Sequence, residues 1–132
     1  MASQDWLRLT RRPVPSLRPL GSAHPGAKSI RVNRTRARLT HARGRQRYPY
    51  PTGTVVVKTA TAGGALSLVA IMRKVRRGSG PASWRYVEYV RGRGGPGFTK
   101  AGGGQALCRS CHVQATHVQR SDWVFYRLPP TE

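Results

Sequence analysis

A series of short apolar runs, separated by glycine and proline turns, follows Tyr48 in the chain. Residues 54 to 60 (TVVVKTA) are rich in β-branched side chains, which favour strands. Residues 66 to 75 form a second apolar run, and residues 84 to 91 alternate between two faces with a period of two. Glycine pairs and prolines mark the turns between these runs. The pattern therefore predicts three strands over these ranges.

Two further elements are predicted towards the C-terminus. The aromatic run within residues 122 to 128 (DWVFYRL) predicts a last strand, which Pro129 ends. Residues 105 to 114 are expected to form a short helix or turn. Short strands joined by tight turns are typical of antiparallel sheets. The expected fold class is therefore mainly β (α+β), with a small antiparallel sheet and short helices.

The first third of the chain shows neither a helical nor a strand period. Residues 1 to 47 are rich in Arg, Pro, Ser and Thr, and their few apolar side chains cannot offset the entropy of ordering. We expect this part to be largely disordered, with at most a short strand near residues 29 to 33. The first 25 residues should contact the rest of the chain little. The expected organisation is a disordered basic segment over residues 1–27, followed by one domain over residues 28–132.

The charge of the chain is strongly positive. It has 24 Lys and Arg residues against four acidic ones, a net charge of +20. Such a charge attracts nucleic acid, anionic lipid or an acidic protein, including an acidic redox partner. One hypothesis is therefore a nucleic-acid-binding protein that uses the basic residues 31 to 47. The sequence has no nucleic-acid-binding fold signature or stacking motif, so nucleic acid is expected only as a non-specific partner.

The two cysteines of the chain stand in a motif with specific chemistry. Residues 108 to 112 read Cys-Arg-Ser-Cys-His, the pattern of c-type haem attachment. Two intervening residues let one helical turn present both thiols to the two vinyl groups of a haem. The adjacent His112 then lies within reach of the iron as an axial ligand. The motif therefore predicts one covalently bound haem c on Cys108 and Cys111.

Three other interpretations of the motif remain open. Cys108 and Cys111 could form half of a zinc site that His112 and His117 complete, although four ligands within ten positions are cramped for structural zinc. A redox-active dithiol is a second possibility, but it usually opens a helix after a strand in a βαβ unit. Chance adjacency of a histidine and a cysteine pair is the third.

Residues 48 to 128 resemble the cytochrome P-460 family, which includes the related β-sheet cytochromes c′. The stretches that carry the resemblance are YPYPTGTVVVK (48–58), IMRKV (71–75), WRYVEY (84–89), CRSCH (108–112) and DWVFYRL (122–128). The haem motif and the terminal aromatic strand are the most specific of them. The resemblance covers about three-fifths of the chain.

The resemblance implies a function as well as a fold. Members bind one haem c, usually as homodimers, with a proximal histidine (here His112) and an open face for small nitrogen ligands. Some oxidise hydroxylamine and carry a lysine cross-linked to the haem; the position that looks most like it is Lys58. The carboxylate near the open face would be Glu88. Met72 could instead be a sixth iron ligand, although a methionine in an apolar strand is usually part of the core.

The location of the protein is a further expectation. The sequence has no apolar run of the roughly 18 residues that a transmembrane helix needs, so no membrane span is expected. Residues 1 to 20 contain no continuous apolar segment of the signal-peptide type. Covalent haem attachment in bacteria takes place outside the cytoplasmic membrane. The resemblance therefore implies a periplasmic or exported protein. The missing signal segment and the Arg-rich first third suggest either a misassigned start or a reading-frame error in this sequence.

Overall fold

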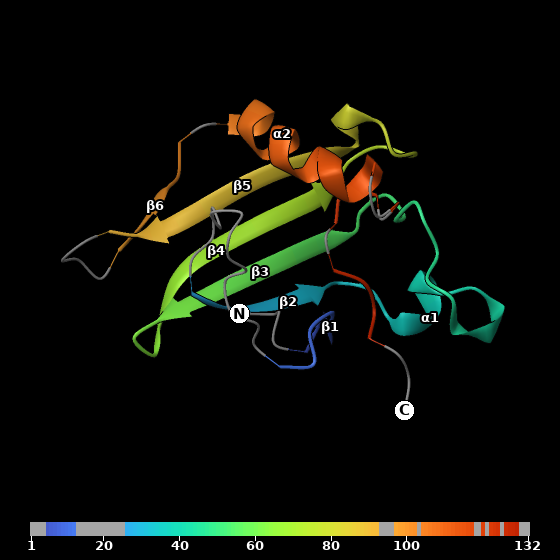
Figure 1. The fold of residues 1–132 in the computed structure, drawn as a ribbon, viewed down its shortest axis with the longest axis horizontal. Coiled ribbons are helices and arrows are strands. Elements are labelled where there is room, and N and C mark those ends of the chain that lie inside the picture. The colour runs from blue at the N-terminus through green and yellow to red at the C-terminus, as the bar shows by residue number, and fades with distance from the viewer. Residues whose placement is uncertain are drawn as a thin grey trace.

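An antiparallel sheet is the centre of the computed structural model, which describes residues 5–12, 26–92, 97–102, 104–117, 120, 122–124 and 126–129. Six strands follow each other in the order β1 to β6 (Figure 1). They are Leu7–Arg8 (β1), Ala27–Val32 (β2), Val55–Ala62 (β3), Ala65–Lys74 (β4), Trp84–Arg91 (β5) and Phe98–Lys100 (β6). The helices are α1 (Arg36–Leu39) and α2 (Gly104–His117), with short 3₁₀ turns at Ala42–Gly44 and Pro81–Ser83. The mainly β fold predicted from the sequence is therefore confirmed.

The three central strands match their predictions within two residues at each end. β3 and β4 form a hairpin closed by Gly63 and Gly64, which have φ values of 56° and 78°. Glycine adopts this left-handed backbone at little cost, whereas other residues rarely do. β5 covers the whole predicted range of 84 to 91. The β-branched runs and the glycine turn between them were thus sufficient to locate these elements.

Alternate residues of the strands point to one buried face. The register places Val32, Val56, Met72 and Tyr86 side by side across β2 to β5, and all four are buried. Directly opposite residues of antiparallel strands share a face, so this row belongs to a continuous core. Figure 1 shows α2 lying across this sheet on the β5 side, and α2 contacts β5. The core therefore lies between the sheet and α2.

The expectation that the first 25 residues contact the domain little is wrong for residues 5–12. β1 pairs with β2, and the Leu9 amide donates to the Ile30 carbonyl at 2.8 Å. Leu9 is only 4% exposed and belongs to the core cluster, with Leu7 packed beside it. Isolated apolar residues are sufficient here because strand alternation turns both leucines towards the core. The other residues of this range, 1–4 and 13–25, lie outside the described part.

Residues 26 to 47, expected to be largely disordered, are also ordered. β2 confirms the short strand predicted near residues 29 to 33, and Leu39 of α1 is fully buried. Arginines bind backbone carbonyls: Arg34 donates to the Thr52 carbonyl and Arg36 to the Pro129 carbonyl, each at 2.9 Å. Charge-assisted hydrogen bonds of this kind stabilise a segment that composition alone assigns to disorder.

The predicted strand over residues 122 to 128 is wrong. Its described residues, 122–124 and 126–128, form a turn and an extended segment without a strand partner. Asp122 and Trp123 have φ values of 49° and 69°, which no strand contains. The Leu128 amide donates to the Gln46 side chain at 2.7 Å instead of to a neighbouring strand. Figure 1 shows this segment running from the end of α2 past the strand ends towards α1.

The buried position of Leu9 leads to a test of the N-terminal packing. We expect Leu9→Ala to lower the free energy of unfolding by about 2 kcal/mol, because the side chain leaves the core and a cavity remains. This loss lies at the lower end of the range usual for Leu→Ala substitutions, because a strand of two residues can move to fill part of the cavity. Urea unfolding measures the change. The exposed Arg8→Ala is the control, and equal stability of the two variants would show that β1 does not pack in solution.

The outer face of the sheet carries the row Arg31, Val57, Ile71 and Val87, all of intermediate exposure. The homodimer implied by the family resemblance stays a prediction.

None of the helices in the described residues is long and apolar enough to cross a membrane.

Candidate functional site

A cavity of about 400 Å³ lies between α2 and the inner face of the sheet. Its volume falls within the range of small-molecule and cofactor sites. The five candidate residues all line this cavity: Lys58, Glu88, Cys108, Cys111 and His112. Residues that are up to 54 positions apart in the sequence are thus brought together by the fold. The motif and the two charged residues named from the resemblance belong to one site.

Helix α2 presents the haem motif to the cavity. The predicted short helix extends from Gly104 to His117, longer than the expected residues 105 to 114. Cys108 and His112 are four residues apart, so they lie on the same helix face. Cys108 packs against the core, whereas Cys111 is exposed, and both are free thiols. Burial raises the pKa of the Cys108 thiol, and the Glu88 charge adds to this shift.

The sequence contained no signal for the role of Gln105, which docks α2 onto the sheet. β6 pairs only with Tyr89 to Arg91 of β5, so Tyr86 lies at an edge that β6 does not cover. The Gln105 side chain accepts from the Tyr86 amide at 2.9 Å and donates to the Tyr86 carbonyl at 2.6 Å. A primary amide can thus replace a strand partner, because it carries a donor and an acceptor side by side.

Removal of this amide should weaken the attachment of α2. Gln105→Ala leaves the amide and the carbonyl of Tyr86 without their partner, and we expect a loss of about 1 to 3 kcal/mol in unfolding free energy. Thermal and urea unfolding measure it. The control is Ser110→Ala, an exposed residue of the same helix at the rim of the cavity, which should change stability little. An unchanged Gln105→Ala protein would show that the helix is held by its apolar contacts alone.

His112 is held in one orientation by the C-terminal segment. Its Nδ1 lies 2.7 Å from the Trp123 carbonyl oxygen. A carbonyl can only accept, so Nδ1 carries the proton and Nε2 is the unprotonated ring nitrogen. Burial lowers the pKa of His112 to about 4, with the Lys58 charge acting in the same direction and the Trp123 carbonyl opposing it. The imidazole is therefore neutral at physiological pH, which is the form that binds metals.

Lys58 and Glu88 belong to one row across the inner face. The register runs from Ile30 to Lys58, Ala70 and Glu88 on four successive strands. The two charged residues are thus two strands apart, roughly 10 Å between backbones, with only the small Ala70 between them. Burial raises the pKa of Glu88, while the Lys58 charge lowers it. This row gives the cavity one amine and one carboxyl group.

The amine of Lys58 should titrate close to neutral pH. Burial lowers its pKa to about 8, and the nearby Lys28 ammonium acts in the same direction, while Glu88 and Cys111 oppose the shift. We expect an NMR titration of ¹³C-methylated lysines to show one amine near 8 in the folded chain, which returns towards 10.5 in urea. Glu88→Gln should lower this value further. A Lys58 signal that titrates near 10.5 in the folded chain would show that the amine is solvated.

The same shift predicts a pH dependence of stability. Between pH 8 and pH 10.5 the unfolded chain keeps a proton on Lys58 that the folded chain has lost. The free energy of unfolding should therefore rise with pH through this interval. Lys58→Met should remove this part of the slope.

The aromatic and apolar walls of the cavity come from both layers. The Tyr86 ring lies 5.2 Å from the His112 ring, and Met72 is 7% exposed within the core, as expected for a sheet residue. Among the described residues the buried Tyr86 hydroxyl has no hydrogen-bond partner. Leu107, also on the cavity, is 62% exposed. Trp84 and Trp123 are buried in the core.

In the part of the chain that the structure describes, there is no group of three or more His, Cys, Asp or Glu side chains that could hold a metal ion. His117 ends α2, and its side chain lies outside the described part. The zinc hypothesis, which needs that side chain, stays a prediction.

The chain matches no protein-family model and no curated protein. Evidence for its function therefore comes from the residues of the cavity.

Proposed function

We propose that the chain is a c-type haem protein of the cytochrome P-460 type, which binds or oxidises a small nitrogen species such as nitric oxide or hydroxylamine. Cys108 and Cys111 would hold the haem by thioether bonds, and Nε2 of His112 would be the axial ligand. The observation that carries the proposal is that His112, with Nδ1 on the Trp123 carbonyl, lines the same cavity as both thiols. A hydrogen bond from the second ring nitrogen is the usual way in which proteins orient a metal-binding histidine.

Three properties of the cavity fit a large, mainly apolar group. Its walls include Met72, Tyr86 and Val124 from the core. The largely exposed Leu107 stands at the cavity, where an apolar ligand would cover it. The unpartnered Tyr86 hydroxyl would gain a partner from a ligand with an acceptor oxygen, which offsets the cost of burying it alone.

When bound, haem iron supplies a coordination position for a small nitrogen molecule and a one-electron redox couple. The chain supplies the proton chemistry around it. Glu88, whose pKa burial raises, is suited to accept a proton from a bound substrate. Lys58, whose pKa burial lowers to about 8, loses its proton more readily than an ordinary lysine and is the candidate for a covalent link to the haem. The resemblance to hydroxylamine-oxidising proteins motivates this last assignment.

Electron paramagnetic resonance of the ferric, haem-loaded chain tests the proposal. We expect a high-spin signal that Met72→Ala leaves unchanged, since Met72 belongs to the sheet core, and a change of the spectrum when nitric oxide is added. A low-spin signal that disappears in Met72→Ala would contradict an open coordination position. It would identify the protein as a six-coordinate electron carrier.

A further inference from the structure

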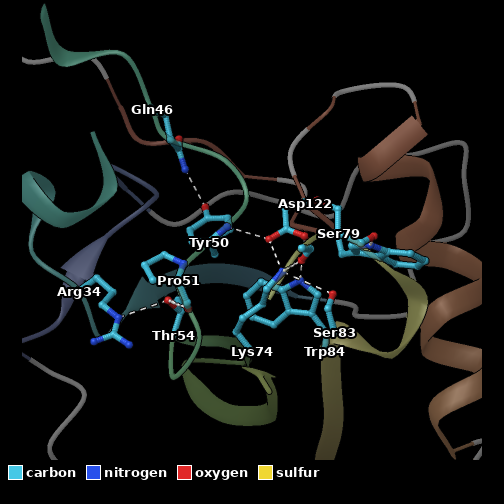
Figure 2. A network of polar contacts seen from close by, with 12 residues as sticks. Arg34, Gln46, Tyr50, Pro51, Thr54, Lys74, Ser79, Ser83, Trp84 and Asp122 are labelled. Atoms are coloured by element: carbon cyan, nitrogen blue, oxygen red, sulfur yellow. Dashed lines mark hydrogen bonds and ion pairs between the residues drawn. The ribbon is translucent and has the colours of Figure 1, made fainter. Parts of the chain in front are cut away.

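Asp122, one residue before Trp123, is the centre of a buried polar network (Figure 2). Its carboxylate accepts from the Tyr50 amide at 2.8 Å, from Lys74 Nζ at 2.6 Å and from Trp84 Nε1 at 3.4 Å. Asp122 is 2% exposed and Lys74 is 1% exposed. Lys74 also donates to the Gly78 carbonyl and to the Ser83 hydroxyl. The network thus joins the C-terminal turn to the end of β4, to β5 and to the loop before β3.

A buried ion pair is weak evidence for stability. The cost of removing both charges from water often equals or exceeds their attraction, and an apolar pair of similar size is often as stable. The directional bonds of Asp122 do provide something that an apolar side chain cannot. They fix the position of the backbone at residue 122 in three directions, from Tyr50, Lys74 and Trp84.

The backbone that this network holds is strained. Asp122 and Trp123 both lie in the left-handed region, which is unusual for any residue other than glycine and especially for a bulky one. Such conformations persist only where the surroundings impose them, and they occur preferentially at functional sites. The turn directs the Trp123 carbonyl at His112 Nδ1, while the Trp123 indole donates to the Ser79 carbonyl at 2.7 Å.

We propose that the buried hydrogen bonds accepted by the Asp122 side chain position His112: they fix the strained turn at residues 122 and 123, so that the Trp123 carbonyl holds the Nδ1 proton and Nε2 faces its ligand. Asp122 is thus a positioning residue that acts through the next peptide group. Its consequence for iron ligation rests on the proposed function, whereas its consequence for the imidazole tautomer does not.

The test measures the tautomer of His112 in the full chain without haem, by ¹⁵N NMR of the imidazole at pH 7. The wild-type chain should show Nδ1 protonated and Nε2 unprotonated. Lys74→Met/Asp122→Gly leaves no unpaired charge, and glycine relieves the strain at φ 49°, so this variant is designed to fold. We expect it to show a mixture of both tautomers.

Two further variants separate positioning from general stability. Lys74→Met/Asp122→Asn keeps an acceptor oxygen and a residue that tolerates the left-handed region, and it should restore the Nδ1-protonated tautomer. Arg36→Ala removes the hydrogen bond that anchors Pro129, downstream of the turn, and should leave the tautomer unchanged. A pure Nδ1-protonated His112 in the glycine variant, or an Nε2-protonated His112 in the wild-type chain, would overturn the proposal.

Should the haem-free chain not stay folded, the loaded ferrous carbon monoxide form provides the same comparison. The Nδ1 proton should then exchange with solvent roughly tenfold faster or more in the glycine variant than in the asparagine variant. Equal exchange in the two would overturn the proposal. A chain that binds no haem but shows the expected tautomers would refute the proposed function and leave the positioning role supported.

Discussion

A Cys108→Ala/Cys111→Ala chain should complete its maturation without covalent haem. Both thiols line the cavity on one turn of α2, and the proposed attachment has no other nucleophilic sulfur, since the sequence contains only these two cysteines. Acid acetone should therefore extract all haem from the double variant and none from the wild-type chain. Each single variant should keep haem through one thioether, with a correspondingly shifted absorption spectrum.

The matched control is Ser110→Ala, which lies on the same helical turn and changes a side chain of similar size. Its hydroxyl is exposed and donates to the Leu107 carbonyl, at 2.7 Å within the helix. This variant should keep covalent haem. Stoichiometric haem that remains with the denatured double-alanine chain would show that the motif is not the attachment site.

Asp122→Ala should destabilise the fold more than Leu9→Ala or Gln105→Ala does, with a loss of about 3 to 5 kcal/mol in unfolding free energy. The substitution leaves the buried Lys74 ammonium without its carboxylate and the Tyr50 amide without its acceptor. It also places a Cβ-bearing residue without polar partners in the left-handed region. Urea unfolding of the full chain measures the change.

Two comparisons identify the cause of this loss. Lys74→Met/Asp122→Ala removes the unpaired charge and should recover a large part of the stability. Asp5→Ala removes an exposed acid and should change stability by less than about 0.5 kcal/mol. Should the double variant be as unstable as Asp122→Ala, the loss would come from the backbone turn and not from the Lys74 charge.

Local patterns were sufficient for the middle of the sheet but not for its two ends. The β-branched runs of β3 and β4, with Gly63 and Gly64 between them, determine strand and turn within a few residues. Leu9 is an isolated apolar residue in an arginine-rich stretch. Hydropathy averaged over a sequence window therefore does not reveal that it is buried. Residues 122 to 128 contain an aromatic run of the kind that favours strands, but tertiary hydrogen bonds impose a left-handed turn, so the predicted strand does not form.

The candidate site, too, could be predicted from the sequence only in part. The spacing of Cys108, Cys111 and His112 predicts their common helix because the relevant geometry is local. Lys58 and Glu88 were named from the resemblance, and their common row depends on a register through Ala70 that composition does not determine. The Trp123 carbonyl, which holds His112, is a backbone group, so no residue type marks it in the sequence.

The most direct test of the haem proposal is the mass and absorption spectrum of the full chain under denaturing, acidic conditions, after export in bacteria that mature c-type cytochromes. We predict one haem in excess of the polypeptide mass, a Soret band that stays with the denatured chain, and a haem-bearing peptide that contains Cys108 and Cys111. A colourless chain of the polypeptide mass alone, with zinc bound under native conditions, would contradict the haem proposal.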